Sequence, residues 1–119
     1  MDTKSLYWVG NSKDDLCEFP EKVIKDVGYA LHLAQIGTKA PSAKPLKGFS
    51  GAGVLEIVEN FDGDTYRAVY TVKFADVVYV LHSFQKKSKH GIKTPAHEIE
   101  LVSDRLKTTE EHYKKRGIQ

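Results

Sequence analysis

Two neighbouring runs of β-branched and aromatic residues constrain the fold of this chain more than any other feature. The runs cover residues 66–72 and 77–84, and only a short connection containing Phe74-Ala75-Asp76 separates them. This pattern is typical of adjacent antiparallel strands. The second run leads into a basic segment, residues 85–93, and then to Thr94-Pro95. The sequence therefore predicts a rigid sheet that holds Arg67 and ends in a lysine cluster. Such an arrangement is suited to binding a polyanion such as RNA.

The remaining elements follow from periodicity and from turn residues. Apolar residues from Val23 to Ala34 recur at three- and four-residue spacing, which predicts a helix opened by Pro20 and ended by Gly37. We further expect a strand over 5–9, a short helix from 12 to about 19, a loop over 38–53, a strand over 54–59, a turn at 60–64 and a helix from Thr94-Pro95 onward. The order β-α-α-β-β-β-α describes an α+β domain, with helices covering one face of an antiparallel sheet and the other face free for function.

Length and composition limit the number of domains, the cellular location and the possible partners. The chain has 119 residues, which suits a single domain spanning 1–119, and its one cysteine cannot form an intramolecular disulfide. This single cysteine, and the lack of an amino-terminal apolar run of signal-peptide length before the first strand, lead us to expect a cytoplasmic protein. No apolar stretch approaches the roughly 20 residues of a membrane span, so no membrane partner is expected. The net charge is only +2. The lysines nevertheless gather in two acid-free segments, residues 39–47 and 86–93, which predict a basic face if the segments meet in space.

Several motifs, in this order along the chain, resemble a known family. They are Pro45-Leu46-Lys47-Gly48, Leu55-Glu56-Ile57, Tyr66-Arg67-Ala68-Val69-Tyr70 and Leu81-His82-Ser83-Phe84-Gln85-Lys86-Lys87, followed by Thr94-Pro95. The chain resembles the RelE/ParE superfamily of bacterial toxins, close to its HigB-type, phage-derived-like branch. The resemblance covers nearly the whole chain. It implies a RelE-like small domain and the toxin of a type II toxin-antitoxin module.

The resemblance also implies roles for individual residues. Arg67 stands at the family's position for an arginine that offers its planar fork to phosphate oxygens. Lys87 matches a catalytic arginine position of the RelE type, where a lysine keeps the charge and loses the fork. Basic residues beyond the last strand commonly contact RNA in the family. The candidate RNA-binding residues are Lys47, Lys86, Lys89 and His90.

Proton transfer is harder to assign from the sequence. His82 is a candidate because imidazole titrates near neutral pH, yet it shares its strand parity with Val78, Val80 and Phe84, which indicates a core position. The strand over 54–59 lacks the basic residues that relatives carry, so the general base is unassigned. Glu56 is more suited to an ion pair with Arg67. The five histidines and one cysteine form no zinc-binding pattern, and no metal or cofactor is expected.

Two classes of function remain open. The first is a metal-independent mRNA endoribonuclease that acts on the translating ribosome and is neutralised by a cognate antitoxin, a helix-turn-helix protein encoded nearby. The second is a binder without catalysis, either a ParE-like inhibitor of DNA gyrase or a degenerate toxin that retains only antitoxin binding. Arg67 and the segment that begins at Lys86 favour the enzyme, whereas the missing basic residues of strand 54–59 favour the binder.

Overall fold

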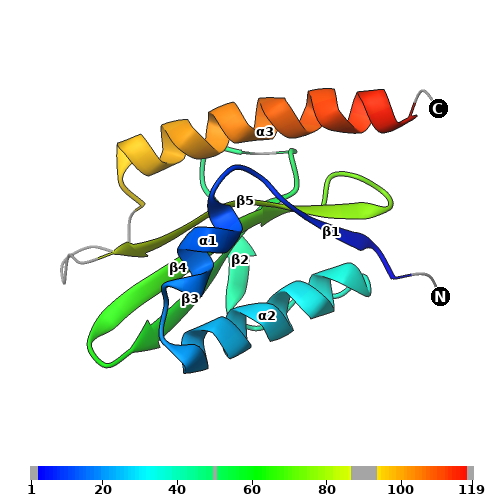
Figure 1. Cartoon of the computed structure of the whole chain (residues 1–119). Helices are drawn as coiled ribbons and strands as arrows, with labels where there is room; N and C mark the ends of the chain where they lie inside the picture. Colours follow the sequence, from blue (N-terminus) through cyan, green and yellow to red (C-terminus); the bar gives the residue numbers. More distant parts are fainter. Residues whose placement is uncertain (1–2, 50, 87–93, 118–119) are drawn as a thin grey trace.

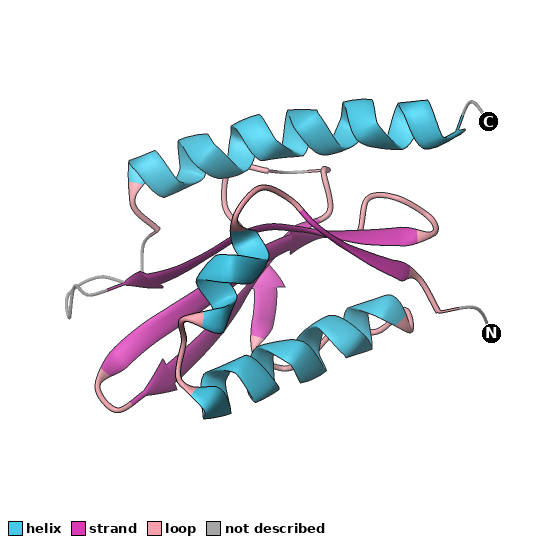
Figure 2. Cartoon of the chain, in the orientation of Figure 1, coloured by secondary structure: helices cyan, strands magenta, loops and turns pink. Residues whose placement is uncertain are grey.

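A sheet with helices on both faces makes up the described part of the chain, which is residues 3–49, 51–86 and 94–117 of the computed structural model (Figures 1 and 2). The α+β class is confirmed, and so is the expected succession of helices and strands apart from one added strand. The elements are β1 (Ser5–Trp8), α1 (Ser12–Cys17), α2 (Glu21–Gln35), β2 (Ala43–Pro45), β3 (Val54–Phe61), β4 (Asp64–Thr71), β5 (Val77–Lys86) and α3 (Ala96–Gly117).

The strands of the sheet lie in the order β1-β5-β4-β3-β2. As expected, β3, β4 and β5 are consecutive antiparallel neighbours, and β1 adds a parallel strand beside β5. The strand β2 lies within the segment 38–53, for which the prediction of a loop was wrong in this part. A strand of three residues shows no readable periodicity, and its pairing with β3 rather than its own sequence defines it.

The turn between β3 and β4 agrees with the sequence. Asp62 has φ 52° and Gly63 has φ 83°, so both central residues occupy the left-handed region. A two-residue hairpin turn of this kind follows the right-handed twist of its strands, and Asp-Gly tolerates it well. The turn fixes the register in which Val58 pairs with Arg67.

One face of the sheet packs against α1 and α2. The apolar stripe of α2 meets the side chains that β4 and β5 turn toward it, and the cluster is almost free of polar atoms. Its most buried members include Val23, Val27, Leu31, Ile57, Ala68, Tyr70, Val78 and Val80. This face supplies a continuous apolar core.

The other face is not free, because α3 covers it (Figure 1). Val102 of α3 packs on Val69, Tyr79 and Leu81, so the expectation that helices lie on one face only was wrong. The physical reason is visible in the strands: β5 is buried at nearly every position, with both side-chain parities covered. A strand that is apolar on both faces needs a layer on each side.

Candidate functional site

A group of polar side chains lies between the sheet and the first turn of α3. Glu56, Arg67, His82 and Lys86 come from β3, β4 and β5, on the face that α3 covers. Thr94 precedes α3 and Glu98 lies in its first turn. We call these six residues the polar layer. The four sheet residues are all less than one-tenth exposed, so the polar layer replaces part of the apolar core.

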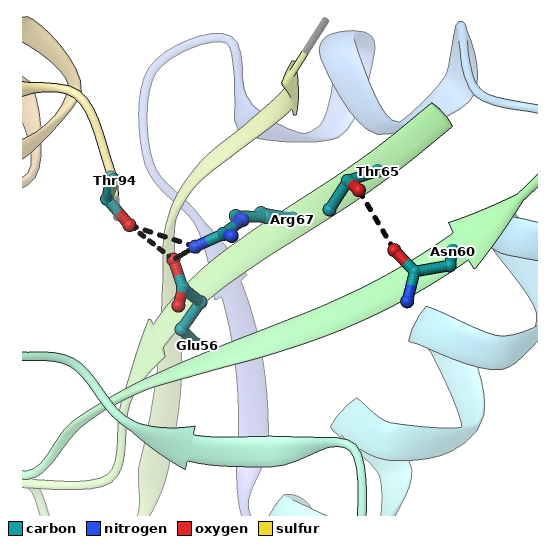
Figure 3. A network of polar contacts seen from close by, with 5 residues as sticks. All are labelled: Glu56, Asn60, Thr65, Arg67 and Thr94. Carbon is teal, nitrogen blue, oxygen red and sulfur yellow. Dashed lines mark hydrogen bonds and ion pairs between the residues drawn. The ribbon is translucent and has the colours of Figure 1, made fainter. Parts of the chain in front are cut away.

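Arg67 is the centre of the layer (Figure 3). Its Nη1 donates to Oε2 of Glu56 at 2.9 Å and to Oγ1 of Thr94 at 3.1 Å. The Thr94 hydroxyl in turn donates to the same Glu56 oxygen at 2.7 Å. The expected ion pair between Glu56 and Arg67 is confirmed. Because Arg67 and Thr94 both donate to one carboxylate oxygen and also bond to each other, this contact fixes the guanidinium closely.

The environment of Arg67 differs from the sequence-based expectation. A position on the uncovered face would present the guanidinium to solvent, but the side chain is only 3% exposed. The cause is α3, which brings Thr94 over the strand. An ionised side chain at this depth needs a charged partner, and Glu56 provides it.

His82 is buried, but the parity argument that placed it with Val78 and Val80 was wrong. Val69 of β4 pairs with His82, and the next residue, Tyr70, pairs with Val80. Leu81 of β5 is therefore an extra residue that shifts the register at this point. This shift turns His82 to the α3 side. There its ring stacks on Phe84 at 4.9 Å between centroids, and its Nε2 lies 2.8 Å from Oε1 of Glu98.

His82 thus connects the sheet to α3. Its Nδ1 is buried and has no hydrogen-bond partner among the described residues. A neutral ring with the proton on Nε2 donates to Glu98 and keeps a lone pair on Nδ1. The exposed His97 also approaches Glu98, at 3.9 Å. An imidazole held by a carboxylate in this way has a fixed orientation.

Lys86 lies at the end of β5, two residues beyond Phe84 on the same face. Burial lowers its pKa, and the neighbouring charge of Arg67 lowers it further, while Glu56 acts in the opposite direction. Two cations and one carboxylate therefore interact within the same part of the layer.

Lys47 does not join this group. It is exposed in the turn after β2, beside the start of β3, where Leu46 bonds to Val54. Lys86 lies beside Thr65, which pairs with Asn60 at the other end of β3. Six residues of strand span about 20 Å. The condition for a common basic face, that the two lysine segments meet, is therefore not fulfilled by Lys47 and Lys86.

The other basic candidates, Lys87, Lys89 and His90, lie outside the described residues. Within the described ranges, no group of three His, Cys, Asp or Glu side chains is arranged to hold a metal ion.

Glu98 was not among the residues predicted from the sequence, and Thr94 was predicted only to start a helix. Both residues contact the sheet, Thr94 from just before α3 and Glu98 from its first turn, so their closeness in the sequence places them at the same end of the helix. The signal was therefore present, but it becomes informative only once α3 is known to cover the β5 face.

Comparison with known proteins identifies the family. A family model described as phage-derived protein Gp49-like (DUF891) matches residues 14–107, which is most of the chain. The chain belongs to this Gp49-like family. The match includes all three central strands and the first half of α3, and therefore every residue of the polar layer. No match to a curated protein was found.

The fold of this chain is similar to that of a solved RelE structure. A mutant of the Escherichia coli toxin RelE in the free state is similar, with a TM-score of 0.58 and 17% sequence identity, over 91% of this chain and 98% of that one. The toxin-antitoxin complex RelBE2 from Mycobacterium tuberculosis matches with a TM-score of 0.44 and 20% identity, over 74% and 97% of the two chains. The resemblance to the RelE/ParE superfamily is confirmed by the family and the RelE-like fold.

The described helices include none that is both long and apolar enough to cross a membrane. The longest, α3, is amphipathic and carries charged residues on its outer side.

Proposed function

We propose that this Gp49-like chain is the toxin of a type II toxin-antitoxin module and that it cleaves mRNA on the translating ribosome. The proposal further takes the chain to be HigB-like, to act in the cytoplasm and to be neutralised by a helix-turn-helix antitoxin encoded nearby. The observation that carries it is the polar layer, in which Arg67 is held on the middle strand of a RelE-like sheet beside Lys86 and His82. The similarity to free RelE supports the fold on which this chemistry would occur.

The reaction needs no more than acid-base and electrostatic help. The ribose 2′-hydroxyl loses a proton and its oxygen attacks the adjacent phosphorus. The bond from phosphorus to the 5′-oxygen breaks, and that oxygen takes up a proton, leaving a 2′,3′-cyclic phosphate and a 5′-hydroxyl. In the proposed mechanism Arg67 and Lys87 stabilise the charge that develops on the phosphate oxygens. His82 takes part in proton transfer.

Further basic residues would hold the substrate. Lys47, Lys86, Lys89 and His90 are the proposed contacts to the RNA backbone, and each phosphate contact makes binding weaker at higher salt. The distance between Lys47 and Lys86 along the sheet suits contacts to different parts of a long RNA. The same cationic groups would attract an acidic segment of the antitoxin.

Induced expression without an antitoxin tests the function directly. We expect growth arrest through loss of translation, with new mRNA 5′ ends inside translated regions by primer extension. Intact messages together with broken DNA would instead assign the chain to the gyrase-inhibiting class.

The burial of the polar layer supports a second candidate. Arg67, His82 and Lys86 are each less than one-tenth exposed, as expected for a degenerate toxin that retains only antitoxin binding. Growth that continues normally, with intact messages and intact DNA, would favour this candidate.

A further inference from the structure

Tyr7 exposes an aromatic ring that neighbouring rings hold in position. It lies on β1, at the edge of the sheet, and is 44% exposed. Its ring packs on that of His112 from α3, at 4.4 Å between centroids and an interplanar angle of 37°. Tyr79 of β5 contacts both rings edge-on, at 5.4 Å from Tyr7 and 5.6 Å from His112. We call Tyr7, Tyr79 and His112 the aromatic platform.

The two inner members keep the platform rigid. The Tyr79 hydroxyl and Nδ1 of His112 are hydrogen-bonded at 2.7 Å. Tyr79 itself is fully buried and packs edge-on against Phe74, at 5.2 Å between centroids. Because each ring is held by the next, the exposed ring of Tyr7 loses little further freedom when a ligand stacks on it.

Basic residues at the end of α3 adjoin the platform. Lys115 and Arg116 are exposed and follow His112 by three and four positions, which places them on its side of the helix. Burial raises the pKa of the Tyr79 hydroxyl, and the nearby charge of Arg116 acts in the opposite direction. Figure 1 shows the last turns of α3 on the same side of the molecule as β1. An exposed ring and two cations therefore lie together at this edge.

We propose that the aromatic platform binds single-stranded RNA, with a nucleobase stacked on Tyr7 and the adjoining phosphates held by Lys115 and Arg116. Every nucleobase has a flat ring, so such a contact accepts RNA of any sequence. An acidic peptide would engage the two cations and leave the ring of Tyr7 without a stacking partner. RNA is therefore the ligand that fits both features.

The platform lies apart from the polar layer. His112 follows Glu98 by fourteen positions on α3, which is about 21 Å along the helix. One RNA strand that runs along α3 can reach both places, so the platform adds a second contact for the proposed substrate. The proposal rests on the proposed function for the choice of RNA, but its binding step requires neither cleavage nor any residue of the polar layer.

The test measures binding of a 2′-O-methyl RNA oligonucleotide, which has bases and phosphates but no free 2′-hydroxyl to react. Tyr7→Ala should lower the affinity about tenfold, because a stacked base contributes about this much to binding. Tyr7→Phe keeps the ring and should stay within about twofold of wild type. Tyr29→Ala is the matched control: Tyr29 is 62% exposed but lies on α2, across the sheet, so the affinity should not change.

The salt dependence of binding tests the phosphate contacts. Each phosphate contact to a single strand changes the slope of log K against log salt by about 0.7. Lys115→Gln should reduce the slope by this amount. Lys114→Gln removes the same charge from a residue two positions after His112, which points away from it, and should leave the slope unchanged.

Nuclear magnetic resonance of the wild type separates stacking from charge. The ring protons of Tyr7 should shift upfield with the intact oligonucleotide, and should stay in place with an abasic strand of equal length, which has phosphates without bases. Equal affinity for the two strands, or folded Tyr7→Ala protein that binds like wild type, would overturn the proposal. The comparison of strands carries the test if Tyr7→Ala fails to fold.

Two further outcomes separate this proposal from its alternatives. Tighter binding of a polyglutamate peptide than of the oligonucleotide would overturn it and indicate an acidic protein partner. If the platform binds RNA but the wild type leaves ribosome-bound mRNA intact, the platform stands and the endoribonuclease function fails. Cleavage by the wild type, with oligonucleotide binding unchanged in Tyr7→Ala, would give the reverse result.

Discussion

The two faces of the sheet are built on different principles. Under α2 the packing consists of aliphatic and aromatic side chains, with Val27, Ala68 and Val78 among its fully buried residues. Under α3 an apolar cluster around Val102 and Leu81 gives way, toward the first turn of the helix, to the polar layer. Helices cover both faces (Figure 1), yet among the described residues the buried charges lie on the α3 face.

This difference separates stability from function. Apolar burial contributes about 25 cal/mol per Å², whereas buried ion pairs often stabilise no more than apolar residues of the same size. The α2 face therefore holds the fold together without help from charges. A buried ion pair on the α3 face is not explained by stability alone, and this supports the proposed role of the polar layer.

The largest expected effect comes from breaking the ion pair on the α3 face. Arg67→Ala leaves Glu56 buried without its cation, and should lower the free energy of unfolding by about 3–5 kcal/mol. Replacing both partners, as Glu56→Leu/Arg67→Met, should restore most of this loss. Urea denaturation followed by circular dichroism measures both. A double variant as unstable as Arg67→Ala would show that the polar layer is needed for folding, which removes the contrast between the faces.

A cavity on the α2 face should have a smaller effect of a different kind. Leu31→Ala truncates a side chain that is 1% exposed, and should cost about 3 kcal/mol. Because this residue lies across the sheet from Arg67, oligonucleotide affinity per folded molecule should stay at the wild-type value. Denaturation and binding titrations on one preparation test both statements. A loss of affinity comparable to that of an Arg67 variant would mean that the faces are coupled.

Tyr70 tests the apolar character of the α2 face through pH. Burial raises its pKa to about 12, and its hydroxyl has no hydrogen-bond partner among the described residues. The unfolded chain loses this proton near pH 10 while the folded chain keeps it, so stability should fall as pH rises from 10 toward 12.

Tyr70→Phe should remove that part of the pH dependence and stabilise the protein at neutral pH by about 1 kcal/mol. Thermal unfolding at several pH values provides the measurement. A loss of stability at neutral pH would mean that the hydroxyl is satisfied, for example by a buried water.

The smallest effect is expected on the outer side of α2. Gly28 lies inside the helix, is exposed, and has no atoms within 4 Å of the position of an added Cβ. Gly28→Ala should therefore stabilise the protein by about 0.5–1 kcal/mol, since glycine is a poor helix former. Its melting temperature should rise, with unchanged binding. A decrease would point to a conformational requirement at this residue that the structure does not explain.

The sequence predicted the fold largely because its signals are local. The spacing of Val23 to Ala34 and the turn at Asp62-Gly63 each specify an element within a few residues. The side of the sheet on which α3 packs is a long-range property. The unbroken apolar run of β5 indicates only that both faces need cover.

The site was less predictable for the same reason. The pairing of Glu56 with Arg67 followed from charge alone, and the structure confirms it. The orientation of His82 depends on an irregularity between β4 and β5 that alternation cannot reveal. The contributions of Thr94 and Glu98 required knowledge of where α3 begins relative to the sheet.

Cleavage of ribosome-bound mRNA by the purified chain tests the central claim most directly. Ribosomes stalled on a defined message would be mixed with wild type and with Arg67→Lys, which keeps a charge for Glu56 and loses the planar fork. We predict internal cleavage by the wild type, and a rate on the order of 100-fold lower for the folded variant. Messages that remain whole with the wild type, or equal cleavage by the two proteins, would contradict the account.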